Sequence, residues 1–151
     1  MQTFLPTQCL NLDFTPIGKI LDRKRLNKQI TEAKQIHNIL IKQAPLTKNN
    51  KVAWENHPAV LMWKTSEDLL AKYHNDLFDV WESIGGKNIK RVKIPYANSY
   101  ACQIPFWFYN EKIYSSHRSA LLFKDLEYYE KFGWIEKAEL NYFWPVQKNA
   151  S

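Results

Sequence analysis

Residues 15–43, TPIGKILDRKRLNKQITEAKQIHNILIKQ, decide the fold class of this chain. Thr15-Pro16 predicts a helix start, because a proline at the first helical position sacrifices no hydrogen bond. No proline follows before Pro45, and apolar residues recur at helical spacing at Leu26, Ile30, Ala33, Ile36 and Leu40. The stretch therefore predicts one long amphipathic helix over residues 17–43.

Two further main helices are predicted on the C-terminal side. After a short segment beginning at His57-Pro58, Thr65 or Ser66 caps a helix that Gly85-Gly86 ends. Ser115 or Ser116 caps another, which Asp125 restarts and Gly133 closes. Residues 87–114 and the aromatic tail 140–146 are expected to be irregular. We expect a mainly α fold, with three main helices and long loops in one compact domain over residues 1–151.

The composition favours an anionic partner. Lys and Arg total 21 of the 151 residues against 15 Asp and Glu, which gives a net charge of +6. Nucleic acid ranks ahead of an anionic membrane or an acidic protein. No apolar run is long enough to span a bilayer, so we expect no membrane partner and a cytoplasmic protein. Cys9 and Cys102 are too few for a disulfide framework or a four-cysteine zinc site, and we expect both to be reduced.

The long predicted helix carries the richest set of chemical groups. Arg25, Lys28, Gln29 and Glu32 are three, four and seven residues apart, so they share one face. Such a face can contact DNA phosphates while keeping one carboxylate near a reacting atom. It can equally be a solvated surface whose charges pair along the helix. The spacing leaves both interpretations open.

Other candidates are weaker when taken alone. The run Lys87, Lys90, Arg91 and Lys93 and the pair His117-Arg118 suit phosphate contacts, or ordinary surface charge. Tyr128 and Tyr129 lie among lysines, and adjacent helical residues do not both point inward, so one of them is a candidate for stacking on a base. The four histidines show no metal-binding spacing.

Several longer strings resemble a known family. They are FLP at 4–6, LDxKRLxKQxxE at 21–32, HPAVxMW at 57–63, HRSxLLxKDxEYYxxFGW at 117–134 and WPV at 144–146. With them the chain resembles the pyrimidine-dimer DNA glycosylases, the endonuclease V-like or pyrimidine-excision family, and within it a bacterial and phage branch. The resemblance implies a helical, endonuclease V-like glycosylase domain that binds double-stranded DNA, kinks it and flips out a nucleotide.

The resemblance also implies a mechanism. In the family an N-terminal α-amine attacks the sugar C1′, and a glutamate on the first long helix, which aligns with Glu32, assists. An ordinary α-amine has a pKa near ~8, against ~10.4 for lysine, so more of it is neutral at pH 7. Since residue 2 is Gln and methionine removal requires a small second residue, we expect the amine to be that of Met1. Lys24 or Lys28 remain alternative amines, as does a water acting with Glu32.

The expected activity is excision of a damaged or modified pyrimidine, a cyclobutane dimer by resemblance, together with abasic-site lyase activity. The expected catalytic residues are Glu32 and Met1, with no cofactor and no metal. The expected DNA contacts are Arg25, Lys28, Gln29, His57, His117, Arg118, Lys124, Tyr128 and Tyr129. We expect a monomer, working on double-stranded DNA in a bacterial cell or in the host of a phage. The alternative is a non-catalytic duplex-binding protein, or a phage accessory or interaction protein that keeps the fold.

Overall fold

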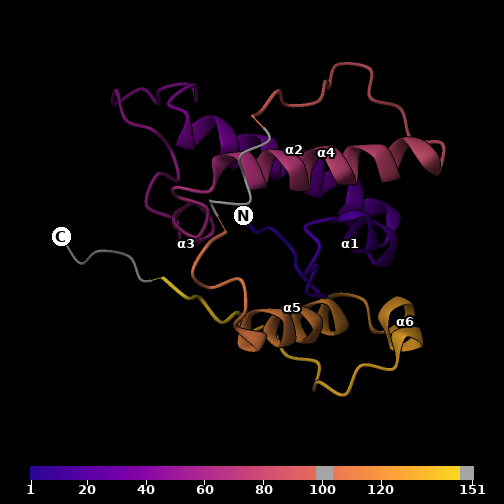
Figure 1. Cartoon of the computed structure of the whole chain (residues 1–151). Coiled ribbons are helices and arrows are strands. Elements are labelled where there is room, and N and C mark those ends of the chain that lie inside the picture. Colours follow the sequence, from indigo (N-terminus) through magenta and orange to yellow (C-terminus); the bar gives the residue numbers. More distant parts are fainter. Residues whose placement is uncertain (98–103, 147–151) are drawn as a thin grey trace.

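The computed structural model describes residues 1–97 and 104–146 and is mainly helical (Figure 1). The helices are α1 (Thr15–Ile20), α2 (Arg23–Leu40), α3 (Pro58–Leu61), α4 (Glu67–Ser83), α5 (Glu111–Lys124) and α6 (Leu126–Tyr129), followed by a 3-10 turn at Glu130–Phe132. The described residues form no strand, only an isolated bridge between Leu46 and Val52. Because α2, α4 and α5 are much longer than the rest, the prediction of three main helices with long loops is confirmed.

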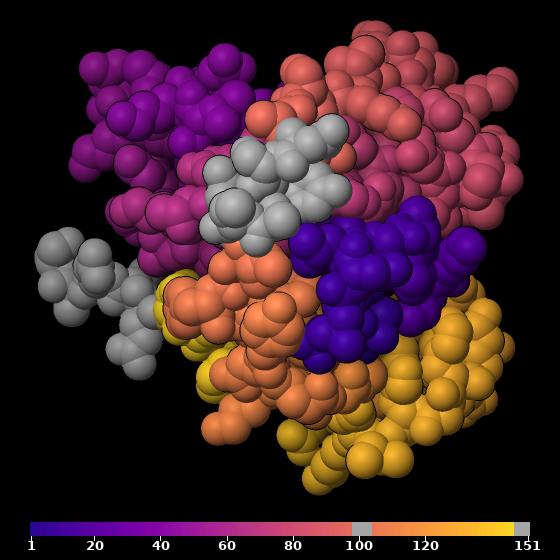
Figure 2. All heavy atoms as spheres, in the orientation of Figure 1, coloured from indigo at the N-terminus to yellow at the C-terminus, as the bar shows by residue number. Residues whose placement is uncertain are grey.

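The N-terminal segment lies between two groups of helices. In Figure 1, α2 and α4 lie together on one side of it, and α5 and α6 lie on the other. On the face shown in Figure 2, the indigo segment lies between the pink part of the surface above it and the yellow part below it. Its residues 2–5 are buried, and fully buried aromatic rings such as Trp63, Trp107 and Tyr73 fill the core. The start of the chain is thereby held inside the fold.

The prediction of one helix over residues 17–43 is wrong, because the stretch forms two helices, and the second of them ends at Leu40. Leu21 is extended, with φ −65° and ψ 137°, and the Asp22 carboxylate accepts a hydrogen bond from the Arg25 N–H as the N-cap of α2. Side chains of this type favour such caps over helix interiors. The first helix begins after Phe14, one residue earlier than Thr15-Pro16 suggested. Gly18 lets it lie close to α4, since a Cβ there would be 2.9 Å from Val80.

The predicted start of α5 is also wrong. Asn110 caps this helix by accepting a hydrogen bond from the Lys112 N–H, so Ser115 and Ser116 lie inside it. His117 and Arg118 therefore occupy its second turn and not its N-terminus. The other boundaries agree with the prediction: Pro58 opens α3, Gly85 (φ +84°) follows α4, Asp125 caps α6 and Gly133 (φ +67°) ends the last turn.

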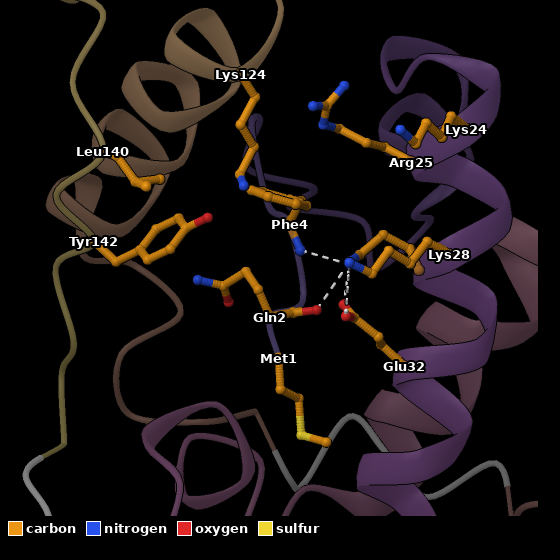
Figure 3. Close-up of a pocket in the computed structure, with 11 residues that line it drawn as sticks. Met1, Gln2, Phe4, Lys24, Arg25, Lys28, Glu32, Lys124, Leu140 and Tyr142 are labelled. Carbon is orange, nitrogen blue, oxygen red and sulfur yellow. Dashed lines mark hydrogen bonds and ion pairs between the residues drawn. The ribbon is translucent and has the colours of Figure 1, made fainter.

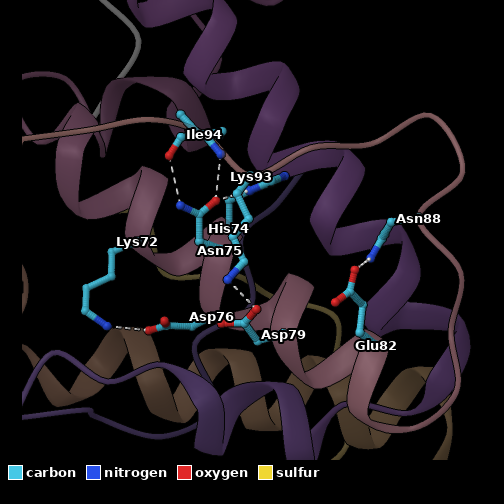
Figure 4. Close-up of polar contacts among 9 residues, drawn as sticks. All are labelled: Lys72, His74, Asn75, Asp76, Asp79, Glu82, Asn88, Lys93 and Ile94. Atoms are coloured by element: carbon cyan, nitrogen blue, oxygen red, sulfur yellow. Dashed lines mark hydrogen bonds and ion pairs between the residues drawn. The ribbon is translucent and has the colours of Figure 1, made fainter.

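The basic loop after α4 is fastened to that helix (Figure 4). The Asn75 side chain donates to the Ile94 carbonyl at 2.9 Å and accepts from the Ile94 N–H at 2.8 Å. Lys93 pairs with Asp79 at 2.6 Å, and Arg91 donates to Asn27 on α2 at 2.7 Å. Much of this positive charge therefore holds the loop in place.

Two further outcomes concern composition. Cys9 is a buried free thiol, and Cys102 lies outside the described residues. Among the helices of residues 1–97 and 104–146, none combines the length and the apolar character that a bilayer span requires.

Candidate active site

A cavity of about 350 Å³ opens where the N-terminal segment passes between α2 and α5 (Figure 3). It is lined by Met1, Gln2, Phe4, Lys24, Arg25, Lys28, Gln29, Glu32, Lys124, Leu140 and Tyr142. Four separate segments thus supply its walls: the first four residues, one face of α2, the end of α5 and the C-terminal tail.

Gln29 ties the N-terminal segment to α2. Its side-chain oxygen accepts from the Phe4 N–H at 2.8 Å, and its amide nitrogen donates to the Gln2 carbonyl at 2.9 Å. The second hydrogen of that nitrogen goes to Glu32 Oε2, also at 2.9 Å. One buried amide therefore orients both the start of the chain and the carboxylate, because an amide offers donors and acceptors together.

Other buried groups fix the residues that follow Met1. The Trp63 indole N–H donates to the Thr3 hydroxyl at 2.9 Å, and the Tyr73 hydroxyl donates to the Phe4 carbonyl at 2.8 Å. The Leu5 N–H donates to His117 Nδ1 at 2.9 Å. With residues 2–5 anchored in this way, Met1 is left at the floor of the cavity beside Glu32.

Four cations and one carboxylate set the electrostatics of the cavity. Lys24, Arg25, Lys28 and Lys124 carry the positive charges, and Figure 3 shows the Lys124 side chain extending from α5 into the space. Burial lowers the pKa of Lys124, and Arg25 and Lys28 lower it further. Glu32 has a side chain that is 14% exposed, and its Oε1 lies 3.8 Å from Lys28 Nζ.

The opposite wall is aromatic. Burial raises the pKa of Tyr142 to about 12, and the negative charge of Glu32 contributes. Tyr142 therefore stays neutral and is a hydrogen-bond donor near physiological pH. The arrangement offers a carboxylate inside a cationic pocket, which suits a substrate with phosphates around a centre that develops positive charge.

The structure brings together six of the residues expected in the site. They are Met1, Arg25, Lys28, Gln29, Glu32 and Lys124. Gln29, which was predicted to contact DNA, is 1% exposed, and its side chain forms hydrogen bonds with Gln2, Phe4 and Glu32. It is a positioning residue.

His117 and Tyr129 are also buried inside the fold. His117 is fully buried, and burial lowers its pKa to about 3, so the ring is neutral and accepts the Leu5 N–H. Tyr129 is fully buried, and its hydroxyl donates to the Asp22 carboxylate at 2.5 Å. Both expected DNA contacts are corrected to roles inside the fold, which follow from the earlier start of α5 and from the packing of α6.

The remaining three candidates lie outside the cavity. His57 caps α3 through Nδ1, and its ring lies between those of Trp54 and Trp144. Arg118 is held by Glu111, Glu136 and the Pro6 carbonyl, so its charge is already balanced. Tyr128 is half-buried, with Lys131 Nζ 3.8 Å from its ring centroid.

Sequence reasoning missed Gln2, Phe4, Leu140 and Tyr142 as lining residues. Nothing in the irregular segments at the two ends of the chain shows which side chains meet across the fold. Only the N-terminal segment carried a sequence signal of this kind. Its polar Gln2 and Thr3 are followed by Phe4-Leu5-Pro6, a pattern that suits a buried, extended segment.

Comparison with known proteins decides the family. A sequence model of the family described as pyrimidine dimer DNA glycosylase matches residues 1–94, which is more than half of the 151 residues. The chain belongs to the pyrimidine dimer DNA glycosylase family. Neither the curated proteins nor the solved structures contain a significant match to it.

The family match covers the N-terminal segment, α2 and α4, and so includes Met1, Gln29 and Glu32. Lys124 and Tyr142, which close the cavity from the other side, lie beyond it. No group of three or more His, Cys, Asp or Glu side chains suited to a metal ion occurs in the described part of this family member.

Proposed function

We propose that the chain is a DNA glycosylase with abasic-site lyase activity, which excises a damaged pyrimidine from double-stranded DNA. The family membership supports the general activity. One observation carries the finer proposal: Met1 and Glu32 line the same cavity, surrounded by four cations. In this proposal the cations hold the phosphates on either side of the target sugar, and the amine and carboxylate act on that sugar.

The chemistry proceeds in two stages. The lone pair of the neutral Met1 amine attacks C1′ while the glycosidic bond breaks. The electron pair of the glycosidic bond leaves with the base. The Glu32 carboxylate stabilises the positive charge that develops on the sugar and takes up the proton that the amine loses. That proton then passes to the departing base.

The second stage cleaves the strand. The nitrogen lone pair then forms a double bond to C1′ as the C1′–O4′ bond breaks, and O4′ takes up a proton from solvent, which gives a protonated imine between the amine and C1′. A proton acceptor in the site then removes a C2′ proton, and the 3′ phosphate leaves by β-elimination. Water finally hydrolyses the imine and frees the amine. Gln2 lines the same cavity, and its Nε2 is buried without a hydrogen-bond partner among the described residues.

Borohydride trapping tests the proposal. Labelled duplexes carrying an abasic site or a thymine dimer are incubated with the protein and borohydride, which reduces an imine to a stable adduct. We expect adducts on both duplexes, with peptide mapping placing them on residue 1. An adduct on Lys24, Lys28 or Lys124 would overturn the assignment of the amine. Tight duplex binding without adduct or cleavage would overturn the enzymatic proposal.

The substitution Glu32→Gln tests the role of the carboxylate in base excision. We expect base excision to fall by about 100-fold or more, since a positioned acid–base group contributes that much, while duplex affinity changes less than about threefold. Glu127→Gln, which changes an exposed carboxylate on α6, is the matched control. Equal loss of binding and excision in Glu32→Gln would instead indicate a structural role.

A further inference from the structure

The segment of residues 137–143, which contains no helix or strand, separates two cavities. Its even-numbered residues Leu140 and Tyr142 line the candidate active site, and its odd-numbered residues line an open groove of about 560 Å³ on the other side. This alternation is that of an extended chain, in which successive side chains point to opposite faces. We call residues 137–143 the strap. It lies beyond residue 94, where the family match ends.

Two serine hydroxyls of α5 hold the strap from the groove side. Ser116 Oγ accepts a hydrogen bond from the Phe143 N–H at 3.0 Å, and Ser119 Oγ accepts one from the Glu139 N–H at 3.2 Å. The Ser119 hydroxyl also donates to the Lys137 carbonyl. Because these contacts are made to the backbone of the strap, they set which of its side chains face the active site.

The ring of Tyr142 is packed on three sides, and its hydroxyl is left to the cavity. The ring centroid lies 6.2 Å from that of Phe4, 5.9 Å from that of His117 and 5.6 Å from that of Trp144. Figure 3 shows the hydroxyl pointing into the space that the Lys124 side chain also enters. Within residues 1–97 and 104–146 this hydroxyl forms no hydrogen bond. Its donor is therefore available to a molecule that enters the cavity.

We infer that Tyr142 is a substrate-contacting residue, whose hydroxyl donates a hydrogen bond to the same backbone phosphate that Lys124 binds. This inference rests on the proposed function, and it adds the strap to the site. Lys124 and Tyr142 form one wall of the cavity, across from Arg25 and Lys28 on α2. A strand that runs between the two walls meets cations on both, so each wall can take one of the phosphates that flank the target sugar.

The electrostatics of this wall favour a phosphate as the acceptor. Tyr142 remains protonated, because burial and the negative charge of Glu32 raise its pKa to about 12. It therefore adds a donor beside Lys124 without adding a charge, and the pKa of Lys124 is already lowered by burial and by Arg25 and Lys28. Tyrosine hydroxyls are among the groups that contact DNA phosphates, and a hydrogen bond to an ionised acceptor is about twice as strong as one between neutral groups.

Methylphosphonate substitution tests the contact without requiring catalysis. Fluorescence anisotropy measures affinity for duplexes that carry a tetrahydrofuran abasic analogue, with the phosphate on its 5′ or its 3′ side replaced singly by an uncharged methylphosphonate. For Tyr142→Phe we expect affinity for the unmodified duplex to fall about tenfold, the effect of losing one hydrogen bond to a charged group. At one of the two methylphosphonate positions, Tyr142→Phe and the wild type should agree within about twofold. Lys124→Ala should lose its effect at that same position.

The variant Ser119→Ala tests the strap, because it loosens the backbone and leaves Tyr142 in place. We expect it to lower affinity for the unmodified duplex about threefold and to add less than about twofold to the effect of Tyr142→Phe, since both act on one contact. Thermal unfolding checks that each variant is folded. Tyr109→Phe is the matched control. It removes the hydroxyl of a tyrosine that is 65% exposed and lines neither the active site nor the groove, so it should match the wild type.

Three results would overturn the inference. They are an unchanged affinity of Tyr142→Phe for the unmodified duplex, an equal loss on all three duplexes, and effects of Tyr142→Phe and Lys124→Ala that disappear at different phosphates. Additive losses for Ser119→Ala and Tyr142→Phe would overturn the role of the strap. The tetrahydrofuran duplex permits neither base excision nor imine formation. An inactive wild type would therefore overturn the proposed function, and the binding comparison would still decide the role of Tyr142.

Discussion

At the scale of single residues, Gln29 shows how one buried side chain organises the site. An apolar residue at this position would leave the Phe4 N–H and the Gln2 carbonyl without their partner, and such groups cost about 1–3 kcal/mol each when buried. It would also release Glu32 from its hydrogen bond. The geometry of the proposed reaction therefore depends on a buried residue whose hydrogen bonds are made within the protein.

His117 makes folding stability depend on pH. Burial lowers its pKa to about 3, against 6.5 in an unfolded chain, so below pH 6.5 the unfolded chain takes up a proton that the folded protein does not. The contribution of neutral His117 to the free energy of unfolding is complete above pH 6.5. It falls by about 1.4 kcal/mol per pH unit as the pH drops toward 3. His74, whose pKa burial lowers to about 4, acts in the same direction.

Denaturant unfolding at pH 7.5 and 5.5 measures this effect. We expect the free energy of unfolding to fall by about 2–3 kcal/mol for the two histidines together. His117→Gln keeps an acceptor for the Leu5 N–H and should remove about half of this pH dependence. His74→Gln should remove a similar share. A stability that is the same at both pH values would contradict the assignment.

At the scale of elements, Asp22 links three helices. It separates α1 from α2, caps α2 through the Arg25 N–H, and receives the Tyr129 hydroxyl of α6. Burial raises the pKa of this carboxyl, but the hydrogen bonds from Tyr129 and Arg25 more than compensate, and its pKa is below the usual range. The junction therefore contains an ionised carboxylate with satisfied partners.

Asp22→Ala should destabilise the fold by about 2–4 kcal/mol, because it removes a cap worth about 1 kcal/mol and leaves the buried Tyr129 hydroxyl without an acceptor for its hydrogen. Tyr129→Phe should cost about 1 kcal/mol, and the double variant should show coupling of about 1–2 kcal/mol. Tyr128→Phe, at the neighbouring half-buried position, should cost less than about 0.5 kcal/mol. Strictly additive losses for Asp22 and Tyr129 would indicate that the contact contributes nothing.

At the scale of the whole molecule, the positive charges that we propose to contact DNA are those gathered around one cavity. Arg91, Lys93 and Arg118 are engaged within the protein, whereas Lys28 is 70% exposed at the mouth of the cavity. The net charge of +6 is thus a poor guide to the number of phosphates bound. The salt dependence of binding reports that number directly.

We expect Lys28→Ala and Lys124→Ala each to reduce the slope of log affinity against log salt by about 1, measured between about 50 and 200 mM salt. Lys137→Ala changes the net charge equally but removes a lysine that pairs with Glu139 away from the cavity, so the slope should stay constant. The proposed phosphate site fails if all three variants lose the same amount.

The sequence by itself determined the mainly helical class of the fold and the face of α2 that bears Arg25, Lys28, Gln29 and Glu32. Those features depend on periodicity and on residues near in the chain. Only the tertiary structure decided that Gln29 and His117 point inward to hold the N-terminal segment, and that Lys124 and Tyr142 close the cavity from across the fold. The physical reason is that burial and hydrogen-bond partners are properties of packing between distant segments, and local sequence carries no record of which segments meet.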